Sequence, residues 1–299
     1  MKLLNGIIAV CNTPFTKDNR IDTASIRRYV NTSINNGVVG FLSLGIAAEV
    51  NKLSIKEKQI VLDTVVGEVN NRVPVIGSTW SKDLEEVKKM IRLVEEYGCD
   101  IVLLNIPYTN KEEYTNNLLH LTEYISKDLM IQDWDFDGYG LPIDLITKLF
   151  DEIDHFKYLK VEVQPAGVKY SEVLEATNNK LHVSGDWAGT QMIEALDRGV
   201  HAFMPTILHD VYRKIFELHS SGNRKKAVVL FNKLLPIISF SHQHLDISVH
   251  FNKRLVHKQG IFDYAHVREP ILKFDDFHEQ VSDELINYAL DLSNQINSN

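Results

Sequence analysis

The chain has 299 residues, of which 44% are hydrophobic and 24% are charged, as in ordinary globular proteins with a substantial core. Its net charge of -8 and the lack of a dense Lys/Arg stripe argue against nucleic acid as a main partner. The only two cysteines, Cys11 and Cys99, lie far apart in the sequence, which suits reduced thiols in a cytoplasmic protein better than a disulfide framework.

The first segment, MKLLNGIIAVC, superficially resembles a signal peptide. Its apolar run is short, however, is broken by Asn5 and Gly6, and leads into NTPF without a small-residue cleavage site. We therefore interpret it as the first core strand. No apolar run of the chain is long enough to span a bilayer, so we expect a cytoplasmic protein without a membrane partner.

Short runs rich in β-branched residues recur along the chain and are nearly continuously apolar, as is typical of parallel strands covered on both faces. The strand candidates are residues 6–11, 39–44, 73–79, 100–106, 129–135, 158–163, 180–186 and 202–206. Amphipathic segments lie between them, for example at 25–34, 83–98 and 142–153. The expected N-caps are Asp22, Ser54, Ser81 and Asp210, and the expected helix ends are Gly37 and Gly98.

Eight strands that alternate with helices predict an α/β fold, a (β/α)8 TIM barrel over residues 1–209. Residues 210–299 show only helical patterns, and we expect them to form a C-terminal helical region that packs on the barrel or on a neighbouring subunit. A doubly wound open sheet is the alternative. It predicts fewer strands and usually a glycine-rich nucleotide turn, and neither GxGxxG nor GxxxxGK[ST] occurs.

The segment FKYLKVEV, residues 156–163, places Lys160 and Glu162 in an otherwise apolar strand. Residues two apart in a strand point to the same face, so the amine and the carboxylate project together. A lysine buried there can have a lowered pKa, which an amine needs in order to attack a ketone and form a Schiff base. The competing interpretation is a lysine at the end of the strand, paired with Glu162 at the solvent edge.

Other residues are weaker candidates for a metal site or for catalysis. The histidine run His242, His244, His250 and His257 lacks metal-site spacing, and no HExxH or CxxC occurs, so we expect surface histidines and no metal site. Trp134 and Trp187 are more often core or pocket-wall residues than catalysts. No GxSxG motif supports a Ser/His/Asp triad.

Several motifs together resemble the dihydrodipicolinate synthase/N-acetylneuraminate lyase superfamily of class I aldolases and dehydratases. The resemblance runs nearly end to end, in the correct order. It is carried by NTPF (12–15), GIAAEVNKLSIKEK (45–58), NRVPVIGST (71–79), NIPYT (105–109), VSGDW (183–187), DRGVHAFMPT (197–206) and VREP (267–270). It implies that Lys160 is the Schiff-base lysine of a lyase acting on a 2-keto acid, with no metal or organic cofactor, and it favours a homo-oligomer, a dimer or a tetramer.

The departures from the family pattern concern the groups that move protons. Ile46 and Ala47 replace two threonines, Thr109 replaces a tyrosine, and Gln132 replaces the tyrosine that usually serves as general acid/base. The arginine that follows this tyrosine, and grips the carboxylate of the aldehyde substrate, has no counterpart. Together with the IQD, KVE and GDW segments, these changes resemble a sub-branch of 2-keto-3-deoxy sugar-acid dehydratases.

We therefore predict a carbon–oxygen or carbon–carbon lyase for a 2-keto-3-deoxy sugar acid. Lys160 is the expected nucleophile, and Glu162 is the favoured acid/base among Glu49, Tyr108, water and the substrate carboxylate. The expected substrate-binding residues are Gly45, Ile46, Ala47, Gln132, Tyr108, Gly185 and Met204. The alternatives are a 4-hydroxy-tetrahydrodipicolinate synthase and a non-catalytic barrel that binds a keto acid.

Overall fold

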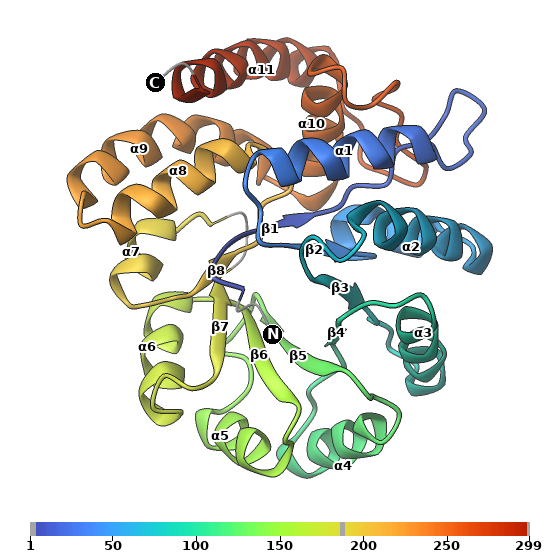
Figure 1. Cartoon of the computed structure of the whole chain (residues 1–299), viewed down its shortest axis with the longest axis vertical. Helices are drawn as coiled ribbons and strands as arrows, with labels where there is room; N and C mark the ends of the chain where they lie inside the picture. The colour runs from blue at the N-terminus through green and yellow to red at the C-terminus, as the bar shows by residue number, and fades with distance from the viewer. Residues whose placement is uncertain (1–3, 186–188, 298–299) are drawn as a thin grey trace.

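A closed parallel barrel forms the centre of the molecule in the computed structural model, which describes residues 4–185 and 189–297 (Figure 1). Neighbouring strands pair in chain order, and β8 returns to pair with β1. The strands are β1 (Gly6–Val10), β2 (Gly40–Ser43), β3 (Val75–Ser78), β4 (Ile101–Leu104), β5 (Asp128–Asp135), β6 (Phe156–Val163), β7 (His182–Gly185) and β8 (Ala202–Phe203). The predicted TIM barrel is confirmed.

Helices alternate with these strands and surround the barrel (Figure 1). They are α1 (Thr23–Asn35), α2 (Ile55–Val69), α3 (Leu84–Glu96), α4 (Lys111–Thr122), α5 (Ile143–Glu152), α6 (Ala166–Ala176), α7 (Met192–Asp197) and α8 (His209–Ser220). Two short 3-10 helices, η1 (Ile46–Ala48) and η2 (Val50–Lys52), follow β2. In the described part of the chain, none of the helices is long and apolar enough to cross a membrane.

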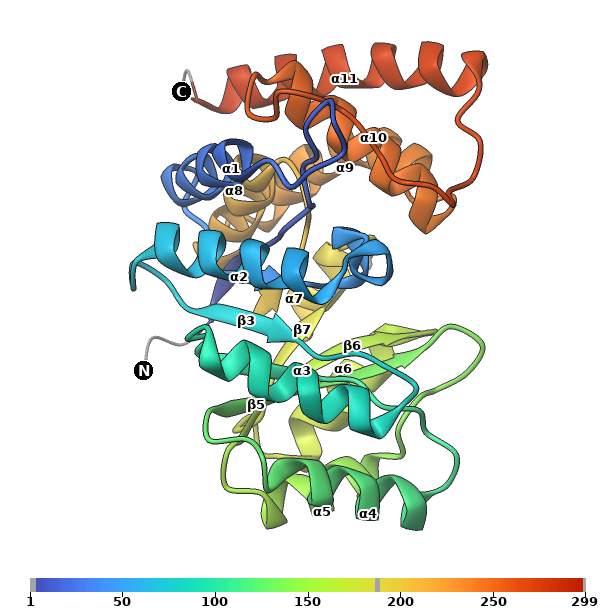
Figure 2. The same cartoon turned by 90° about the vertical axis from the view of Figure 1, so that its right-hand side faces the viewer.

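Three more helices follow the barrel, namely α9 (Arg224–Ser241), α10 (Leu245–Lys258) and α11 (Asp276–Asn297). Both views show them gathered at one end of the molecule beside α1 and α8, with α4 and α5 at the opposite end (Figures 1 and 2). Asp210 of α8 accepts hydrogen bonds from Ser293 and Asn297, which fastens α11 to the barrel layer.

Two hydrophobic clusters follow from the alternation of side chains along the strands. The inner cluster fills the barrel with residues such as Ile8, Met130 and Tyr158, and the outer cluster joins the strands to the helices through residues such as Leu159 and Val161. Because residues two apart share a face, Lys160 and Glu162 point into the barrel with Tyr158. The alternation of side chains along β6 therefore places this charged pair next to the inner cluster and not among the helices.

Two of the predicted N-caps are confirmed, because their side chains accept hydrogen bonds from amides in the first turn of the helix. Asp22 caps α1 by accepting from the Ser25 amide, and Ser54 forms a capping box with Glu57 at α2. Two predicted N-caps are wrong. Asp83 rather than Ser81 caps α3, and α8 begins after Leu208, so Asp210 lies inside its first turn.

Candidate active site

A pocket of about 390 Å³ opens at the carboxyl ends of the barrel strands, the end that carries catalysis in TIM barrels. Strand residues form its floor, and the segment between α9 and α10 forms part of its wall. It is lined by Val10, Leu42, Gly45, Ile46, Ala47, Ser78, Leu103, Gln132, Trp134, Phe136, Lys160, Glu162, Met204, Thr206, His242, Gln243, His244, Leu245 and Ser248. The lining is mainly apolar, with a few convergent polar groups, as in sites for small molecules.

Lys160, Glu162 and Gln132 form a buried polar cluster in this pocket. Lys160 Nζ lies 2.9 Å from Glu162 Oε2, and the two side chains are only 8% and 9% exposed. Gln132 is the ladder neighbour of Lys160 on β5, and its amide donates to the same carboxylate oxygen. The carboxylate is therefore held next to the amine by a group that cannot itself take up a proton near neutral pH.

The loop after β2 supplies a second wall of the pocket. Leu44 has a left-handed backbone with φ of 59°, which turns the chain into η1, and Gly45, Ile46 and Ala47 line the pocket. The first amides of a helical turn have no acceptor within that turn. Asn12 Nδ2 donates to the Ala47 carbonyl and Thr13 Oγ1 to the Ala48 carbonyl, each at 2.7 Å, which fixes the loop on the end of β1.

Two residues that we expected to bind substrate lie outside this pocket. Tyr108 is 40% exposed, stacks edge-on against Tyr114, and lines a neighbouring depression that shares Gln132 and Trp134 with the pocket. Gly185 faces the outer layer, because a Cβ at this position would lie 2.9 Å from the Tyr170 hydroxyl. Asp186 and Trp187, which the sequence also singled out, lie outside the described residues.

Glu49, one of the acid/base alternatives, also points away from the pocket. Its carboxylate contacts the ammonium groups of Lys253 and Lys52 and accepts from the Arg268 amide at 3.0 Å. Asp133 faces outward as well. It pairs at 2.9 Å with the buried Lys169, although burial still raises the pKa of Asp133 above its ordinary value.

Sequence reasoning missed the wall between α9 and α10. The prediction of surface histidines is wrong for His242, which is partly buried, and right for His244, which is exposed; both nevertheless line the pocket together with Gln243, Leu245 and Ser248. Burial lowers the pKa of His242, and its Nδ1 lies 3.0 Å from the Ile238 carbonyl. No periodic pattern indicates that a segment so far along the chain returns to the mouth of the barrel.

The Dihydrodipicolinate synthetase family model matches residues 3–289. The chain belongs to this family. A 4-hydroxy-tetrahydrodipicolinate synthase of Methanococcus vannielii is 28% identical over 240 residues, which cover 79% of this chain and 82% of that protein.

Solved structures agree on the fold of this dihydrodipicolinate synthetase family protein. A dihydrodipicolinate synthase from Rhodopseudomonas palustris superposes with a TM-score of 0.87 at 23% identity, covering 96% of this chain and 97% of the other. An N-acetylneuraminate lyase from Fusobacterium nucleatum complexed with pyruvate gives a TM-score of 0.82 at 18% identity, covering 98% and 97%. The family match confirms the predicted resemblance, and membership supports the coarser prediction of a class I aldolase-type lyase.

Proposed function

We propose that this family member is a Schiff-base lyase that dehydrates or cleaves a 2-keto-3-deoxy sugar acid. The observation that carries the proposal is the buried amine of Lys160 beside the Glu162 carboxylate in a pocket at the carboxyl ends of the strands. A lysine with a carboxylate partner can act both as a nucleophile toward a ketone and as one half of a proton-transfer pair.

In the proposed reaction the neutral amine of Lys160 adds to the C2 ketone of the substrate. Loss of water gives an iminium, which accepts electron density from C3. For dehydration, Glu162 removes a C3 proton to give the enamine, and the C4 hydroxyl then leaves as water with the proton that Glu162 returns. For cleavage, the base removes the proton of the C4 hydroxyl, the C3–C4 bond breaks to release an aldehyde, and the resulting enamine takes the proton from the base at C3 to give the iminium. Water finally hydrolyses the imine and releases Lys160.

The rest of the pocket fits a 2-keto acid with a single carboxylate. The amides of Gly45, Ile46 and Ala47 would hold the C1 carboxylate, with Met204 on the opposite side. Gln132 would orient Glu162, because its amide already donates to that carboxylate. No arginine lines the pocket in the described residues, which argues against a second substrate gripped by its own carboxylate.

A second candidate is a 4-hydroxy-tetrahydrodipicolinate synthase, which condenses pyruvate with aspartate semialdehyde. The observation that favours it is the name borne by the relatives, among them a protein of Methanosphaera stadtmanae that is 26% identical over 294 residues. The same lysine chemistry serves both candidates. They differ in whether the enamine loses a leaving group or attacks an aldehyde.

Borohydride reduction followed by intact mass measurement tests the shared step. Incubation with pyruvate or a 2-keto-3-deoxy acid should add the mass of the reduced ligand, and peptide mapping should place it on Lys160. An intact mass that stays unchanged with every such ligand contradicts the proposal. Lys160→Met is the control, because its side chain has similar length but no nucleophile.

A panel of 2-keto-3-deoxy acids with product identification then separates the candidates. Turnover of a panel member that is lost in Lys160→Met supports the sugar-acid lyase. Condensation of pyruvate with aspartate semialdehyde, or rescue of a lysine auxotroph, supports the synthase instead. Ligand-induced stabilisation without any turnover supports the non-catalytic barrel, for which the missing hydroxyl relay is the argument.

The proposal also includes a cytoplasmic homo-oligomer, a dimer or a tetramer. The cytoplasmic location is supported by Cys11 and Cys99, which are both buried free thiols, as expected in a reducing compartment. The oligomer is supported by the family resemblance of the sequence. Light scattering coupled to size-exclusion chromatography measures the mass of the assembly, and a mass of 34.2 kDa would contradict it.

A further inference from the structure

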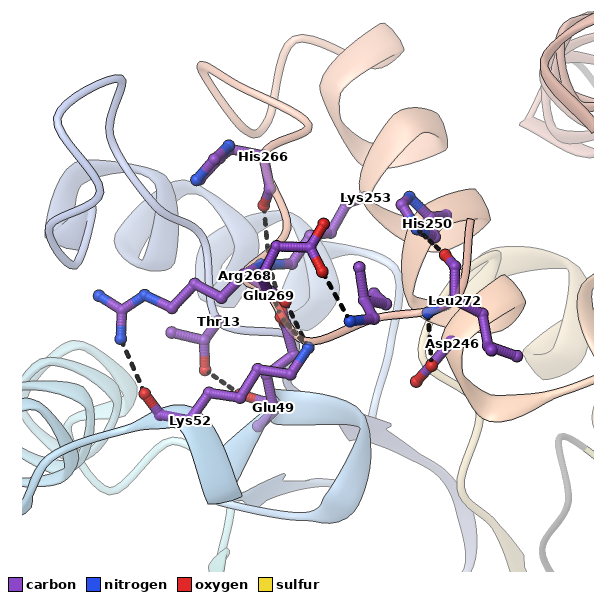
Figure 3. A network of polar contacts seen from close by, with 12 residues as sticks. Thr13, Glu49, Lys52, Asp246, His250, Lys253, His266, Arg268, Glu269 and Leu272 are labelled. Carbon is purple, nitrogen blue, oxygen red and sulfur yellow. Dashed lines mark hydrogen bonds and ion pairs between the residues drawn. The ribbon is translucent and has the colours of Figure 1, made fainter. Parts of the chain in front are cut away.

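A buried ion pair joins the substrate-side loop after β2 to the C-terminal helices. Glu49 follows η1 directly, and one of its carboxylate oxygens contacts Lys253 Nζ of α10, 204 positions along the chain (Figure 3). The other oxygen lies 3.1 Å from Lys52 Nζ and 3.0 Å from the Arg268 amide nitrogen. Lys253 also donates to the His266 carbonyl at 2.9 Å, so the ammonium group links Glu49 to the segment after α10.

Burying both charged groups of this pair carries a desolvation penalty. The Lys253 side chain is fully buried and that of Glu49 is 2% exposed. Burial lowers the pKa of Lys253 to about 8, although Glu49 acts in the opposite direction. Burial pushes the pKa of Glu49 upward, yet Lys253, the Arg268 amide and Lys52 together leave this pKa below its ordinary value. Because a buried ion pair seldom stabilises a fold more than apolar residues would, its geometry needs another reason.

The backbone at Glu49 supplies that reason. Glu49 has φ of 55° and ψ of 33°, a left-handed conformation that is unfavourable for a residue other than glycine. Such a conformation persists only where the surroundings hold it. The Glu49 amide donates to the Ile46 carbonyl at 3.1 Å, so the left-handed residue closes the 3-10 turn that presents Gly45, Ile46 and Ala47 to the pocket.

The partner of Glu49 belongs to a helix that also lines the pocket. Leu245 and Ser248 of α10 form part of the wall, and Lys253 lies further along the same helix. Lys253 Nζ is 4.2 Å from the centroid of the Phe15 ring, which belongs to the segment after β1. One ion pair therefore connects the loop that carries the Gly45–Ala47 amides to a neighbouring helix that also lines the pocket.

We propose that the Glu49–Lys253 pair positions the Gly45–Ala47 amides for the carboxylate of the keto acid. Glu49 and Lys253 are positioning residues in this proposal, because they act through the loop and do not touch the substrate. The inference rests on the proposed function and goes beyond it by giving the C-terminal helices a part in substrate affinity. Loss of the pair should weaken binding of the carboxylate while the chemistry at Lys160 continues at saturation.

The experiment measures the pyruvate concentration that gives half-maximal borohydride trapping on Lys160, and the trapping rate at saturation. Lys253→Met should raise the half-saturating concentration about tenfold to a hundredfold, the scale expected when a binding group is misplaced. The saturating rate should change little. The double variant Glu49→Gln/Lys253→Met removes the buried negative charge that Lys253→Met leaves with Lys52 as its remaining ion-pair partner. It also keeps an acceptor for the Arg268 amide, so it guards against simple misfolding.

Two matched variants separate positioning from stability. Arg254→Met removes a cation from the next position of α10, where Arg254 pairs at 2.9 Å with Asp283 of α11 and not with the loop. Lys169→Met removes a cation that is equally buried and pairs with Asp133. Both should lower the thermal midpoint and leave the half-saturating pyruvate concentration unchanged.

The outcomes distinguish this inference from the proposed function. A folded double variant with the wild-type half-saturating concentration overturns the positioning role and leaves the Schiff-base proposal standing. Equal increases in all four variants also overturn it, because they would mark a general effect of loosened packing. Failure of the wild-type chain to trap pyruvate or any 2-keto-3-deoxy acid overturns the proposed function, and the positioning role with it.

Discussion

Glu162 Oε2 lies 2.9 Å from Lys160 Nζ and also accepts a hydrogen bond from Gln132. This arrangement gives the carboxylate two donors on one oxygen and keeps it beside the amine that would attack a ketone. A positioned acid/base typically contributes a rate factor of about 10²–10⁴. The relationship between these two residues therefore gives a direct test of what moves protons in this pocket.

Glu162→Gln should lower kcat by about 10²–10⁴-fold, because the amide keeps the size of the side chain but cannot exchange a proton. The measurement is steady-state turnover of the best substrate in the panel, with borohydride trapping of pyruvate as a check that Lys160 still reacts. Gln132→Leu is the matched variant, since it removes a donor to Glu162 and no titratable group. Equal losses in both variants would show that Glu162 acts by orientation and not by proton transfer.

The close approach of β3 to α3 gives a prediction about stability. A Cβ at Gly77 would lie 2.6 Å from Val94 Cβ and 3.0 Å from Cys99 Sγ, so Gly77→Ala forces the helix away from the strand. We expect a loss of about 1–3 kcal/mol in the free energy of unfolding, measured by urea denaturation. Gly67→Ala in α2 is the control, because nothing lies within 4 Å of its Cβ. It should stabilise the chain by up to about 1 kcal/mol, and a similar loss in both variants would contradict the packing argument.

The strands could be predicted because a parallel barrel buries both faces of each strand and leaves an apolar run in the sequence. Their bounds shift by a few residues, most clearly at β8, where the predicted run 202–206 contains a two-residue strand that ends at Phe203. Beyond Phe203 the backbone carbonyl of Pro205 continues the pairing, by accepting from the Val10 amide at 3.0 Å.

The floor of the pocket could be predicted for a related reason. Strand ends converge in a barrel, so Gln132 and Lys160, which are far apart in sequence, become ladder neighbours once the strands are in order. Sequence periodicity does not encode contacts beyond the strand and helix repeats. It therefore gave no sign that Glu49 meets Lys253, that the residues around His244 close the pocket, or that Gly185 faces outward.

The buried imidazole of His182 predicts acid sensitivity. Burial, followed by the stacked ring of His201 at 4.5 Å, lowers the pKa of His182 to about 3. Because this lies below the ordinary 6.5, the unfolded chain binds more protons between the two values, and the free energy of unfolding falls as the pH drops from 6.5 toward 3. His182→Phe should remove up to about 1.4 kcal/mol per pH unit from that slope, measured by urea denaturation between pH 7 and about pH 4.5. The control is His120→Gln at an exposed position, and an unchanged slope in His182→Phe would reject the assignment.

The carboxylate of Glu57 in α2 predicts the opposite pH dependence to a buried histidine, and it tests how the segment around Arg268 is held to α2. The hydrogen bond from Arg268, at 2.5 Å, lowers the pKa of Glu57 to about 2, against the effect of partial burial. A carboxyl with a lowered pKa stabilises the fold above its unfolded value of 4.5, and this contribution is lost as the pH falls from 4.5 to 2. Glu57→Gln should therefore lower the free energy of unfolding by about 1–3 kcal/mol at pH 7, while the amide still supports the capping box at Ser54.

The difference between wild type and Glu57→Gln should shrink as the pH falls below about 4.5, where the carboxylate of the wild type begins to protonate on unfolding. Thermal or urea unfolding at pH 7, 5, 4 and 3 follows this convergence. Glu86→Gln is the matched control, because Glu86 pairs at 2.6 Å with Lys89 on an exposed helix face and such pairs contribute little. A constant deficit in Glu57→Gln from pH 7 to 3 would mean that the bond to Arg268 does not depend on the charge of Glu57, and that packing alone holds the segment around Arg268 to α2.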